Sequence, residues 1–316
     1  MENVRQSQGE RGEREKKNVA LSSVVAAVFL TTMKLVVGLL TGSLGILAEA
    51  AHSGLDLVAA VVTFLAVRVS GRPPDSEHHY GHGKVENLSA ALETFLLLVT
   101  CVWIIWGAVG RLVRHHIEIE VTFWSFAVMV TSIVVDVSRS RLLSRVARKY
   151  NSQALEADAL HFSTDIWSSG VVILGLLCVK LSDWRPAWAF LRYADAVAAI
   201  FVALIVVYVG VRLGWRTVEA LLDAAPAGME ERIKSAVEGL AGVTDCHNVR
   251  VRTSGPIPFV DVHVLMDGSQ TLKEAPDLTE EIERVIGGLQ PNADVTVHPE
   301  PLADEAGKGP GVPGQA

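Results

Sequence analysis

Two histidine–carboxylate pairs lie inside apolar stretches of the chain, each pair spaced four residues apart. They are His52 and Asp56 in GSLGILAEAAHSGLDLVAAVVTF, and His161 and Asp165 in ALEADALHFSTDIWSSGVVILGLL. On a helix, residues four apart lie one turn above each other on the same face, so each stretch presents one imidazole and one carboxylate in a single direction. Two such faces turned toward each other would supply two nitrogen and two oxygen ligands, a set that suits a four-coordinate zinc ion. We call these four residues the quartet.

The apolar surroundings of the quartet favour a functional role over a packing role. A single His in an apolar helix is more often a hydrogen-bonded packing residue, but ionisable groups at membrane depth are costly and usually mark an ion or proton pathway. Imidazole binds metal and also takes up protons near neutral pH, so protons and metal compete for the same sites. This competition predicts an exchange of metal for protons. Glu49, three residues before His52, is a candidate supporting or entry group, with a structural role equally open.

A second concentration of ligand-type residues lies between two apolar runs. The segment RPPDSEHHYGHGK, residues 72–84, holds three His and two acidic residues within eight positions, framed by Pro and Gly. This composition is typical of a metal-binding loop, and the alternative is a solvated polar loop.

The hydropathy of the chain predicts a polytopic α-helical membrane protein. The chain has 316 residues, of which 50% are hydrophobic, and runs of about 20 apolar residues are long enough to cross a bilayer core. A single run of this kind could be a buried core helix, but six in series predict six transmembrane helices. No signal peptide is expected, because the first 17 residues are polar and the first apolar run is too long. The predicted spans are 18–40, 44–69, 86–110, 119–142, 155–180 and 190–213.

The distribution of Lys and Arg predicts the orientation. Fifteen of these residues lie in the N-terminal arm (1–17), the second and fourth connections and the segment after the sixth span, against five on the other side. The excess of positive charge on cytoplasmic loops then places both termini in the cytoplasm. The predicted membrane domain is 18–213.

The character of the chain changes after Trp215. Residues 214–316 contain 8 Lys and Arg against 17 Asp and Glu, and such an acidic domain excludes nucleic acid as a partner while attracting cations. Its helical and alternating patterns follow the order αββαβ, which predicts a small α+β domain of metallochaperone-like type over 214–301. A dimer contact would help so small a core. The Gly- and Pro-rich end, 302–316, is predicted to be a disordered tail.

Ligand-type residues recur in this acidic domain. His247, His263 and His298 fall in or beside predicted strands, with Glu300 two residues further on, and a solvated strand face is the alternative for each. The three cysteines are too widely separated to predict a disulfide framework or a CxxC site. Cys246, beside His247, is a weak candidate for a soft metal ligand.

Four motifs together make the chain resemble the cation diffusion facilitator family, which includes bacterial iron and zinc effluxers and eukaryotic zinc transporters. They are ILAEAAHSGLD, HHYGHGKVEN, NSQALEADALHFSTDIWSS and LLDAAP, and the similarity runs from about Asn18 to Glu300. The resemblance implies a homodimer in the cell membrane that exchanges cytoplasmic metal for protons by alternating access.

The resemblance also implies a role for individual residues. The quartet would be the transport site between the second and fifth spans. A loop site would comprise Asp75, His78 and His82. A cytoplasmic-domain site would comprise His247, His263, His298 and Glu300. Lys84 would pair with Asp223 at the dimer junction.

Two departures from the family pattern bear on the metal. Some bacterial relatives carry Asp at the position of His52, whereas the arrangement found here resembles that of zinc-preferring eukaryotic members. Relatives with a two-metal cytoplasmic site carry a further His where this chain has Pro276, which puts the number of metals in that site in doubt.

These features together predict a Zn²⁺/H⁺ antiporter that exports metal from the cytoplasm, with Zn²⁺ as substrate and as a structural or regulatory ion. The same architecture selective for Mn²⁺, Fe²⁺, Co²⁺ or Cd²⁺ is the alternative, because affinity order alone does not set selectivity. An intramembrane metalloenzyme is disfavoured, since no HExxH motif occurs in the sequence. A membrane metal sensor is disfavoured because a sensor has no need of ligands inside the bilayer.

Overall fold

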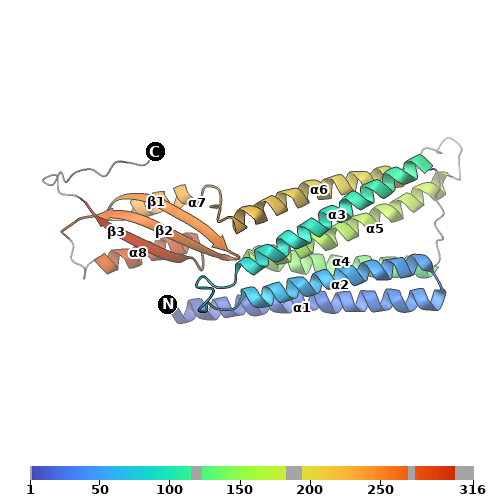
Figure 1. Ribbon diagram of the computed structural model, residues 1–316, viewed down its shortest axis with the longest axis horizontal. Helices are drawn as coiled ribbons and strands as arrows, with labels where there is room; N and C mark the ends of the chain where they lie inside the picture. Colours follow the sequence, from blue (N-terminus) through green and yellow to red (C-terminus); the bar gives the residue numbers. More distant parts are fainter. Residues whose placement is uncertain (1, 115–122, 183–193, 270–274, 303–316) are drawn as a thin grey trace. The chain divides into compact units, whose positions relative to one another are not determined.

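The computed structural model describes residues 2–114, 123–182, 194–269 and 275–302, and the chain divides into two compact units, Met1–Leu221 and Leu222–Ala316. The predicted tail, apart from residue 302, and the first residues of the predicted fourth and sixth spans lie outside the described residues. Six long helices form the first unit (Figure 1): α1 (Glu2–Thr41), α2 (Leu44–Ser70), α3 (Lys84–Arg114), α4 (Phe123–Tyr150), α5 (Gln153–Ser182) and α6 (Ala194–Leu221).

The helical part of the predicted fold class is confirmed. Within the described residues, the helical segments long and apolar enough to cross a membrane are Arg11–Thr41, Glu49–Ser70, Lys84–Gly107 and Ile200–Leu221. Helices α4 and α5 have 28 and 30 residues, which is sufficient length, but charged side chains lower their hydropathy. Several of these charged side chains are buried against the other helices, including Asp136, Arg139 and Asp158.

Two helix ends differ from the prediction. Helix α1 begins at Glu2, so the segment predicted as an N-terminal arm continues the first span as one helix. Its charged run EREKK consists of good helix formers, and Lys16 within it is buried in the unit. Helix α6 continues to Leu221, eight residues beyond the predicted end of the sixth span at 213, and the first compact unit ends at the same residue.

Small residues allow α3 and α6 to approach closely, and Figure 1 shows the two helices side by side. A Cβ at Gly210 would lie 3.2 Å from Leu98 Cδ2, and one at Gly214 would lie 3.2 Å from Thr94 Cγ2. Glycine at both positions therefore brings the α6 backbone against α3, as is common between membrane helices. Across this contact Leu97, Cys101 and Val206 form a buried apolar cluster.

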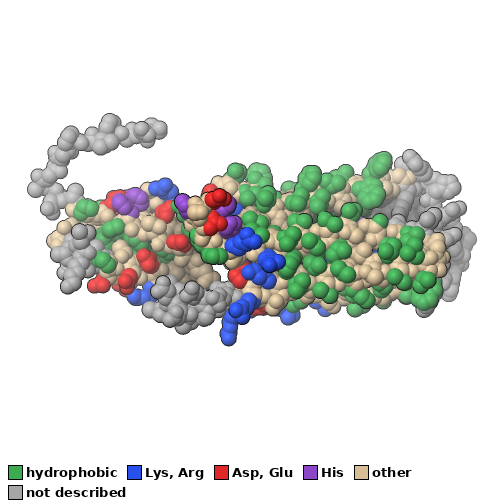
Figure 2. All heavy atoms as spheres, turned by 60° about the horizontal axis from the view of Figure 1, so that its bottom comes forward, with side chains coloured by type: hydrophobic (Ala, Val, Ile, Leu, Met, Phe, Trp, Pro, Cys, Tyr) green, Lys and Arg blue, Asp and Glu red, His purple; other side chains and the backbone are tan. Residues whose placement is uncertain are grey.

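The outer surface of the helical unit is apolar. Hydrophobic side chains cover the sides of the helices in Figure 2. The exposed hydrophobic residues of this unit include Leu40, Trp106 and Tyr208, with exposed fractions of 82%, 74% and 69%. A surface of this kind is stable in contact with lipid chains and would aggregate in water.

The second unit has the predicted αββαβ order, which confirms the rest of the fold class. Its elements are α7 (Met229–Glu238), β1 (Val243–Ser254), β2 (Ile257–Met266), α8 (Ala275–Leu289) and β3 (Asp294–Pro301). Strand β2 lies in the centre of the sheet, antiparallel to β1 and parallel to β3. Side chains of α7 and α8 share one core with β1 and β2, so the helices cover one face and leave the other face of the sheet uncovered.

An irregularity in β1 determines which side chains reach the uncovered face. The β1–β2 register shifts between His247 and Arg250, and Asn248 there has a φ of 50°. Asn tolerates this left-handed conformation better than most residues, and the extra residue forms a β-bulge. Cys246 before the bulge and Val249 after it both point into the core, while His247 points outward.

Candidate metal sites and the family of the chain

The quartet residues lie close together between α2 and α5. Asp56 Oδ1 lies 3.0 Å from His161 Nε2, and His52 Nε2 lies 3.9 Å from Asp165 Oδ1. Within each helix, the His and Asp side chains are 4.0 Å apart on α2 and 3.8 Å apart on α5. The four side chains are 12–36% exposed, so they are enclosed by the helices but are not sealed from the surroundings. Two imidazoles and two carboxylates thus surround one small volume, an arrangement that matches the donor set of zinc.

Glu49, for which a supporting and a structural role were both open, forms an ion pair with α1. Its Oε2 lies 3.2 Å from Lys34 Nζ of α1, and the Glu49 side chain is 63% exposed. Lys34 also donates to Ser53 Oγ at 2.8 Å. Glu49 therefore belongs to a contact between α1 and α2, and Lys34, a buried cation that the sequence reading left out, lies next to the quartet helix.

A buried polar network on the α1, α4 and α5 helices was also missed. Arg139 Nη2 donates to Ser23 Oγ at 2.9 Å, and Ser23 in turn donates to Asp158 Oδ2 at 3.0 Å. The guanidinium also lies 3.5 Å from Asp136 Oδ1 and 3.5 Å from the ring centroid of Phe162. Arg139 falls within the predicted fourth span but was counted with the basic residues of the fourth connection, and it is buried within the unit. A charged residue inside an apolar run was the signal that could have revealed it.

A second buried network joins the ends of four helical segments. Glu86, at the start of α3, accepts hydrogen bonds from Lys16 Nζ at 2.9 Å, from Ser70 Oγ at 2.9 Å and from Ser152 Oγ. Glu86 has no exposed surface, and Lys16 is 2% exposed. The Glu86 carboxylate therefore ties together α1, α2, α3 and the residue that precedes α5. The neighbouring Asn87 donates to Gln153 of α5 at 2.9 Å.

The predicted loop residues come together between α2 and α3. Asp75 Oδ1 lies 3.2 Å from His78 Nδ1, and Asp75 Oδ2 lies 3.4 Å from His82 Nε2. The two rings are 4.4 Å apart between centroids, and His82 Nδ1 is buried without a hydrogen-bond partner. The backbone N–H groups of His78 and Glu77 donate to Asp75 Oδ1 and lower the pKa of this carboxyl, so Asp75 is ionised at neutral pH.

In the second unit, three histidines form one row across the uncovered face of the sheet. His247 is opposite His263 in the β1–β2 register, and His263 is opposite His298 in the β2–β3 register. Glu300 lies beside this row, with Oε1 2.7 Å from His263 Nδ1 and Oε2 3.4 Å from His247 Nε2. His298 Nε2 lies 3.9 Å from Glu300 Oε1. The hydrogen bond from His263 lowers the pKa of Glu300, which favours the charged ligand form.

Two further residues orient this row. Asp245 Oδ2 lies 3.0 Å from His247 Nδ1, which leaves Nε2 directed at Glu300, and Asn248 Nδ2 lies 3.1 Å from His263 Nε2. Carboxylates commonly orient metal-binding imidazoles in this way. The alternation of strand side chains could have indicated Asp245, two residues before His247, whereas the role of Asn248 depends on the bulge.

Cys246 is in the hydrophobic core, so the suggestion that it is a ligand beside His247 is wrong. Its side chain has no exposed surface and packs with Val264 and Ile282. Burial raises the pKa of its thiol to about 11. At pH 7 the thiolate fraction is then about a hundredfold below that of an ordinary thiol, because each pKa unit is a factor of ten.

We therefore expect Cys246 to react slowly with iodoacetamide. In a variant carrying Cys101→Ala and Cys178→Ala, labelling of the folded protein at pH 7 should be at least about a hundredfold slower than labelling of the denatured chain. Mass spectrometry over a time course measures both rates. Equal rates would mean that the thiol is accessible and that the core assignment is wrong.

Lys84 and Asp223 belong to different compact units. Lys84 Nζ donates to the backbone carbonyl of Leu221, the last residue of α6, at 3.3 Å. Asp223 Oδ1 lies 3.9 Å from Arg252 Nη1 within the second unit. The pairing of Lys84 with Asp223 at a dimer junction stays a prediction.

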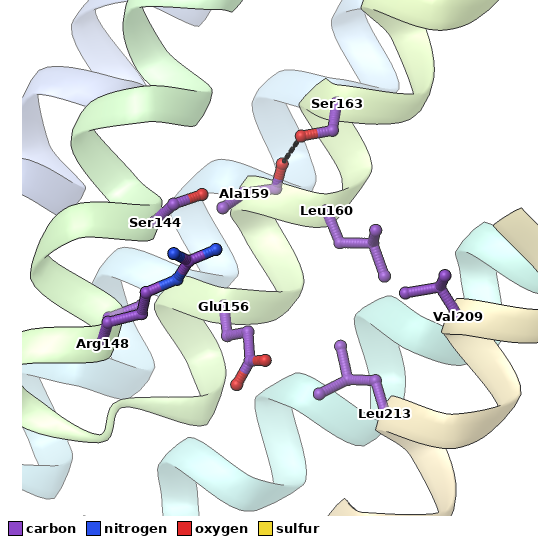
Figure 3. A pocket seen from close by; sticks show the side chains of 9 residues that line it. Ser144, Arg148, Glu156, Ala159, Leu160, Ser163, Val209 and Leu213 are labelled. Carbon is purple, nitrogen blue, oxygen red and sulfur yellow. Dashed lines mark hydrogen bonds between the residues drawn. The ribbon is translucent and has the colours of Figure 1, made fainter.

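A cavity of about 220 Å³ lies between α4, α5 and α6. Figure 3 shows Leu160, Val209 and Leu213 on one side of it and Ser144 and Arg148 on the other. Glu156, also in its lining, forms an ion pair with Arg216 of α6. The cavity is thus polar on the α4 side, and its volume is several times the roughly 30 Å³ that one water molecule occupies in the liquid.

Family models cover both units. Residues 20–222 match the model described as the cation efflux transmembrane domain, and residues 225–302 match the one described as the cation efflux protein cytoplasmic domain. The chain is 31% identical over 290 residues to the cation-efflux pump FieF of Yersinia enterocolitica, covering 91% of this chain and 93% of that protein. It is 29% identical over 285 residues to the cation-efflux pump FieF of Cronobacter sakazakii, with coverages of 90% and 92%. A solved structure of CzrB is 27% identical and covers 25% of this chain and 100% of that one, with a TM-score of 0.24.

The two family models and the two FieF relatives together extend over nearly the whole length of the chain, and the two models divide it near the boundary of the two units described above. They also confirm the resemblance that the motifs around the quartet indicated. The chain belongs to the cation efflux family and is a multi-pass membrane transporter rather than an enzyme.

Proposed function

We propose that the protein is a Zn²⁺/H⁺ antiporter that exports zinc from the cytoplasm by alternating access, with the quartet as its transport site. It acts as a homodimer in the cell membrane with both termini in the cytoplasm. The observation that carries this proposal is the convergence of two imidazoles and two carboxylates from α2 and α5, with His161 and Asp56 3.0 Å apart. Nitrogen and oxygen donors in this number suit tetrahedral zinc.

Proton coupling follows from the chemistry of the same ligands. A His nitrogen must be unprotonated to bind metal, and a carboxylate must be ionised, so metal binding releases protons and proton binding releases metal. Metal would enter the quartet from the cytoplasm and leave it on the other side as protons arrive. Such an exchange uses an inward proton gradient to drive metal outward.

The other two clusters would bind zinc as a resident ion. Asp75, His78 and His82 supply three ligands, and the buried, unpartnered Nδ1 of His82 is a polar atom that a metal could satisfy. The row of His247, His263 and His298 with Glu300 supplies four ligands on an open sheet face. The second family model covers this cytoplasmic dimer domain, and metal on its uncovered face would stabilise one arrangement of the two copies.

The test is transport by purified protein in proteoliposomes. Flux of Zn²⁺, Fe²⁺, Mn²⁺, Co²⁺ and Cd²⁺ is followed with an internal metal indicator while a pH gradient is imposed and the membrane potential is clamped with K⁺ and valinomycin. We expect zinc flux that follows the gradient and reverses when the gradient is reversed. Zinc flux indifferent to the gradient would contradict antiport, and flux of another metal with zinc inert would contradict the selectivity.

For the loop site we expect Asp75→Asn to weaken zinc binding by at least tenfold. The amide keeps the shape of the side chain but removes the ionised oxygens that face His78 and His82. The measurement is calorimetric titration of the purified protein, with Glu77→Gln as the matched control, because Glu77 contributes only its backbone N–H to this turn. Unchanged affinity in Asp75→Asn would show that this loop holds no zinc.

A further inference from the structure

One buried carboxyl in the helical unit has no partner in the part of the chain that the structure describes. Charged side chains that are at least nine-tenths buried occur at eight positions of the described helices, and seven of them have hydrogen-bonded or ion-paired partners. The exception is Glu93 of α3, which is 4% exposed and whose two carboxyl oxygens meet no donor among the described residues. An ionised carboxylate without a partner at this depth is so costly that the group takes up a proton instead.

The surroundings of Glu93 reinforce the neutral form. Asp158 of α5 follows Ala157, which shares a buried cluster with Ala90, one turn before Glu93 on α3. Asp158 is 1% exposed, and its Oδ1 has no partner among the described residues. Asp158 reaches the Arg139 guanidinium through Ser23, so a cation compensates Asp158 but not Glu93. Two carboxyls so placed are stable with one proton between them, because two like charges cannot both remain in a low dielectric.

The other charged groups on the helices packed against α3 are accounted for. On α6, Gly210 and Gly214 face α3, and Arg216 pairs with Glu156. The described charged residues of α2, α5 and α6 besides Asp158 either belong to the quartet, pair elsewhere or are exposed; they are Glu49, His52, Asp56, Arg68, Glu156, His161, Asp165, Arg212, Arg216 and Glu219. On α3 itself, Glu86 lies two turns before Glu93 and is bonded to Lys16.

Glu93 lies on the part of α3 that packs against α5 next to the quartet. Leu160, which directly precedes His161, packs against the apolar clusters that contain Ala90 and Leu97, the residues one turn before and one turn after Glu93. A doubly charged ion in a low dielectric acts on carboxyls beyond its own ligands, and it favours their ionisation. The arrival of metal and the ionisation of Glu93 would thus favour each other.

A route to water is also close. Leu160 and Leu213 line the cavity of Figure 3 and also pack against Ala90, one helical turn before Glu93. The polar side of this cavity, with Ser144 and Ser163, can hold water.

We propose that Glu93 carries a transported proton: it is protonated when the quartet holds no metal and releases the proton when a divalent cation enters the quartet. The O–H bond breaks, the electron pair stays on the carboxylate, and the proton passes to water on the side from which the metal arrived. Glu93 then takes up a proton again when the metal leaves. This inference rests on the proposed antiport and adds to it a carrier that binds no metal.

The test counts protons released when zinc binds. Purified protein in detergent is titrated with zinc in weakly buffered solution containing a pH indicator. Each protein is measured with and without the additional substitution Asp56→Ala. The difference in protons released between the two is the release that depends on the quartet. We expect the quartet-dependent release to be smaller by about one proton per zinc in Glu93→Gln than in the unmodified protein. In Glu93→Asp, which keeps a carboxyl, the release should return to the value of the unmodified protein. The same difference in Glu93→Gln as in the unmodified protein would overturn the proposal.

Failure of the proposed transport site can be distinguished from failure of the proposal for Glu93. If Asp56→Ala leaves zinc binding and proton release unchanged, the quartet is not the transport site and the proposed function fails first. If Glu93→Gln does not fold, infrared difference spectra of the unmodified protein decide instead. Zinc should remove a carboxylic-acid C=O band, and a spectrum without such a loss would mean that no buried carboxylic acid ionises.

Discussion

Replacing Asp56 with Ala should lower zinc flux by at least about a hundredfold. Asp56 is the most enclosed of the four quartet side chains, and its Oδ1 lies 3.0 Å from His161 and 4.0 Å from His52, so it belongs to both halves of the site. Its removal leaves three ligands and takes away one of the two carboxylate charges that offset a divalent cation. Loss of a group that only orients a metal ligand already costs up to about a hundredfold in affinity, and the loss of a ligand should cost at least as much.

The measurement is initial zinc uptake into proteoliposomes at fixed pH gradient, with thermal melting of the variant to show that it is folded. Glu49→Gln is the matched control, because Glu49 is an acidic residue on the same helix that is 63% exposed and pairs with Lys34. We expect the control to keep its flux within about twofold, because the Glu49 side chain is largely exposed, a Gln oxygen can still accept from Lys34, and Lys34 keeps its hydrogen bond to Ser53. Full flux in Asp56→Ala would remove the quartet from the transport path, and loss of flux in Glu49→Gln would restore Glu49 to the site.

Glu86→Ala should destabilise the helical unit by about 3–5 kcal/mol, the usual cost of removing one partner of a buried ion pair. Lys16 would keep only Glu13, which is 28% exposed, and the hydroxyls of Ser70 and Ser152 would lose their acceptor. For a chain of this size the loss corresponds to a fall in Tm on the order of 10 °C. Because Glu86 joins segments from four parts of the chain, we expect the melting transition to broaden as well.

Thermal denaturation in detergent, followed by circular dichroism, measures this effect. The control is Glu15→Ala, which breaks an ion pair of 2.6 Å with Lys149 where the two side chains are 42% and 54% exposed. An exposed pair contributes at most about 1 kcal/mol, so the Tm of the control should stay within a few degrees of the original. A Glu86→Ala protein as stable as the Glu15→Ala protein would show that the buried network is not a main source of stability.

The sequence alone was sufficient to predict the elements and the main site. Apolar runs separated by polar segments predict the helices, because only a helix satisfies its own backbone in lipid, and alternation predicts the strands of the second unit. The four-residue spacing of His52 and Asp56, and of His161 and Asp165, places each pair on one helix face. Ionisable groups in apolar helices are costly unless they share a function, and two imidazoles with two carboxylates suit one metal ion. The convergence of the two faces could therefore be predicted.

Helix spacing defines a face but not the neighbour that the face meets. The sequence therefore left open whether Glu49 supports the quartet or has a structural role, and in the structure its carboxylate pairs with Lys34 of α1. Arg139 was counted with the basic residues of the fourth connection, yet it is buried. It donates to Ser23, 116 residues away, and Ser23 donates to Asp158, 135 residues further along the chain from Ser23. Such pairings depend on how helices rotate against one another, which is decided by packing over the whole unit.

The β-bulge at Asn248 is the corresponding case in the second unit. Simple alternation would place His247 and Val249 on the same face, whereas the extra residue turns His247 outward and Val249 and Cys246 inward. Composition and spacing by themselves determined that this chain is a membrane protein with paired metal ligands and an αββαβ domain. Only the tertiary structure decided which buried charges have partners, because the partners are far apart in sequence and the local sequence does not specify which of them meet. Glu93, the buried carboxyl left without one among the described residues, could be recognised only after the partners of the others were known.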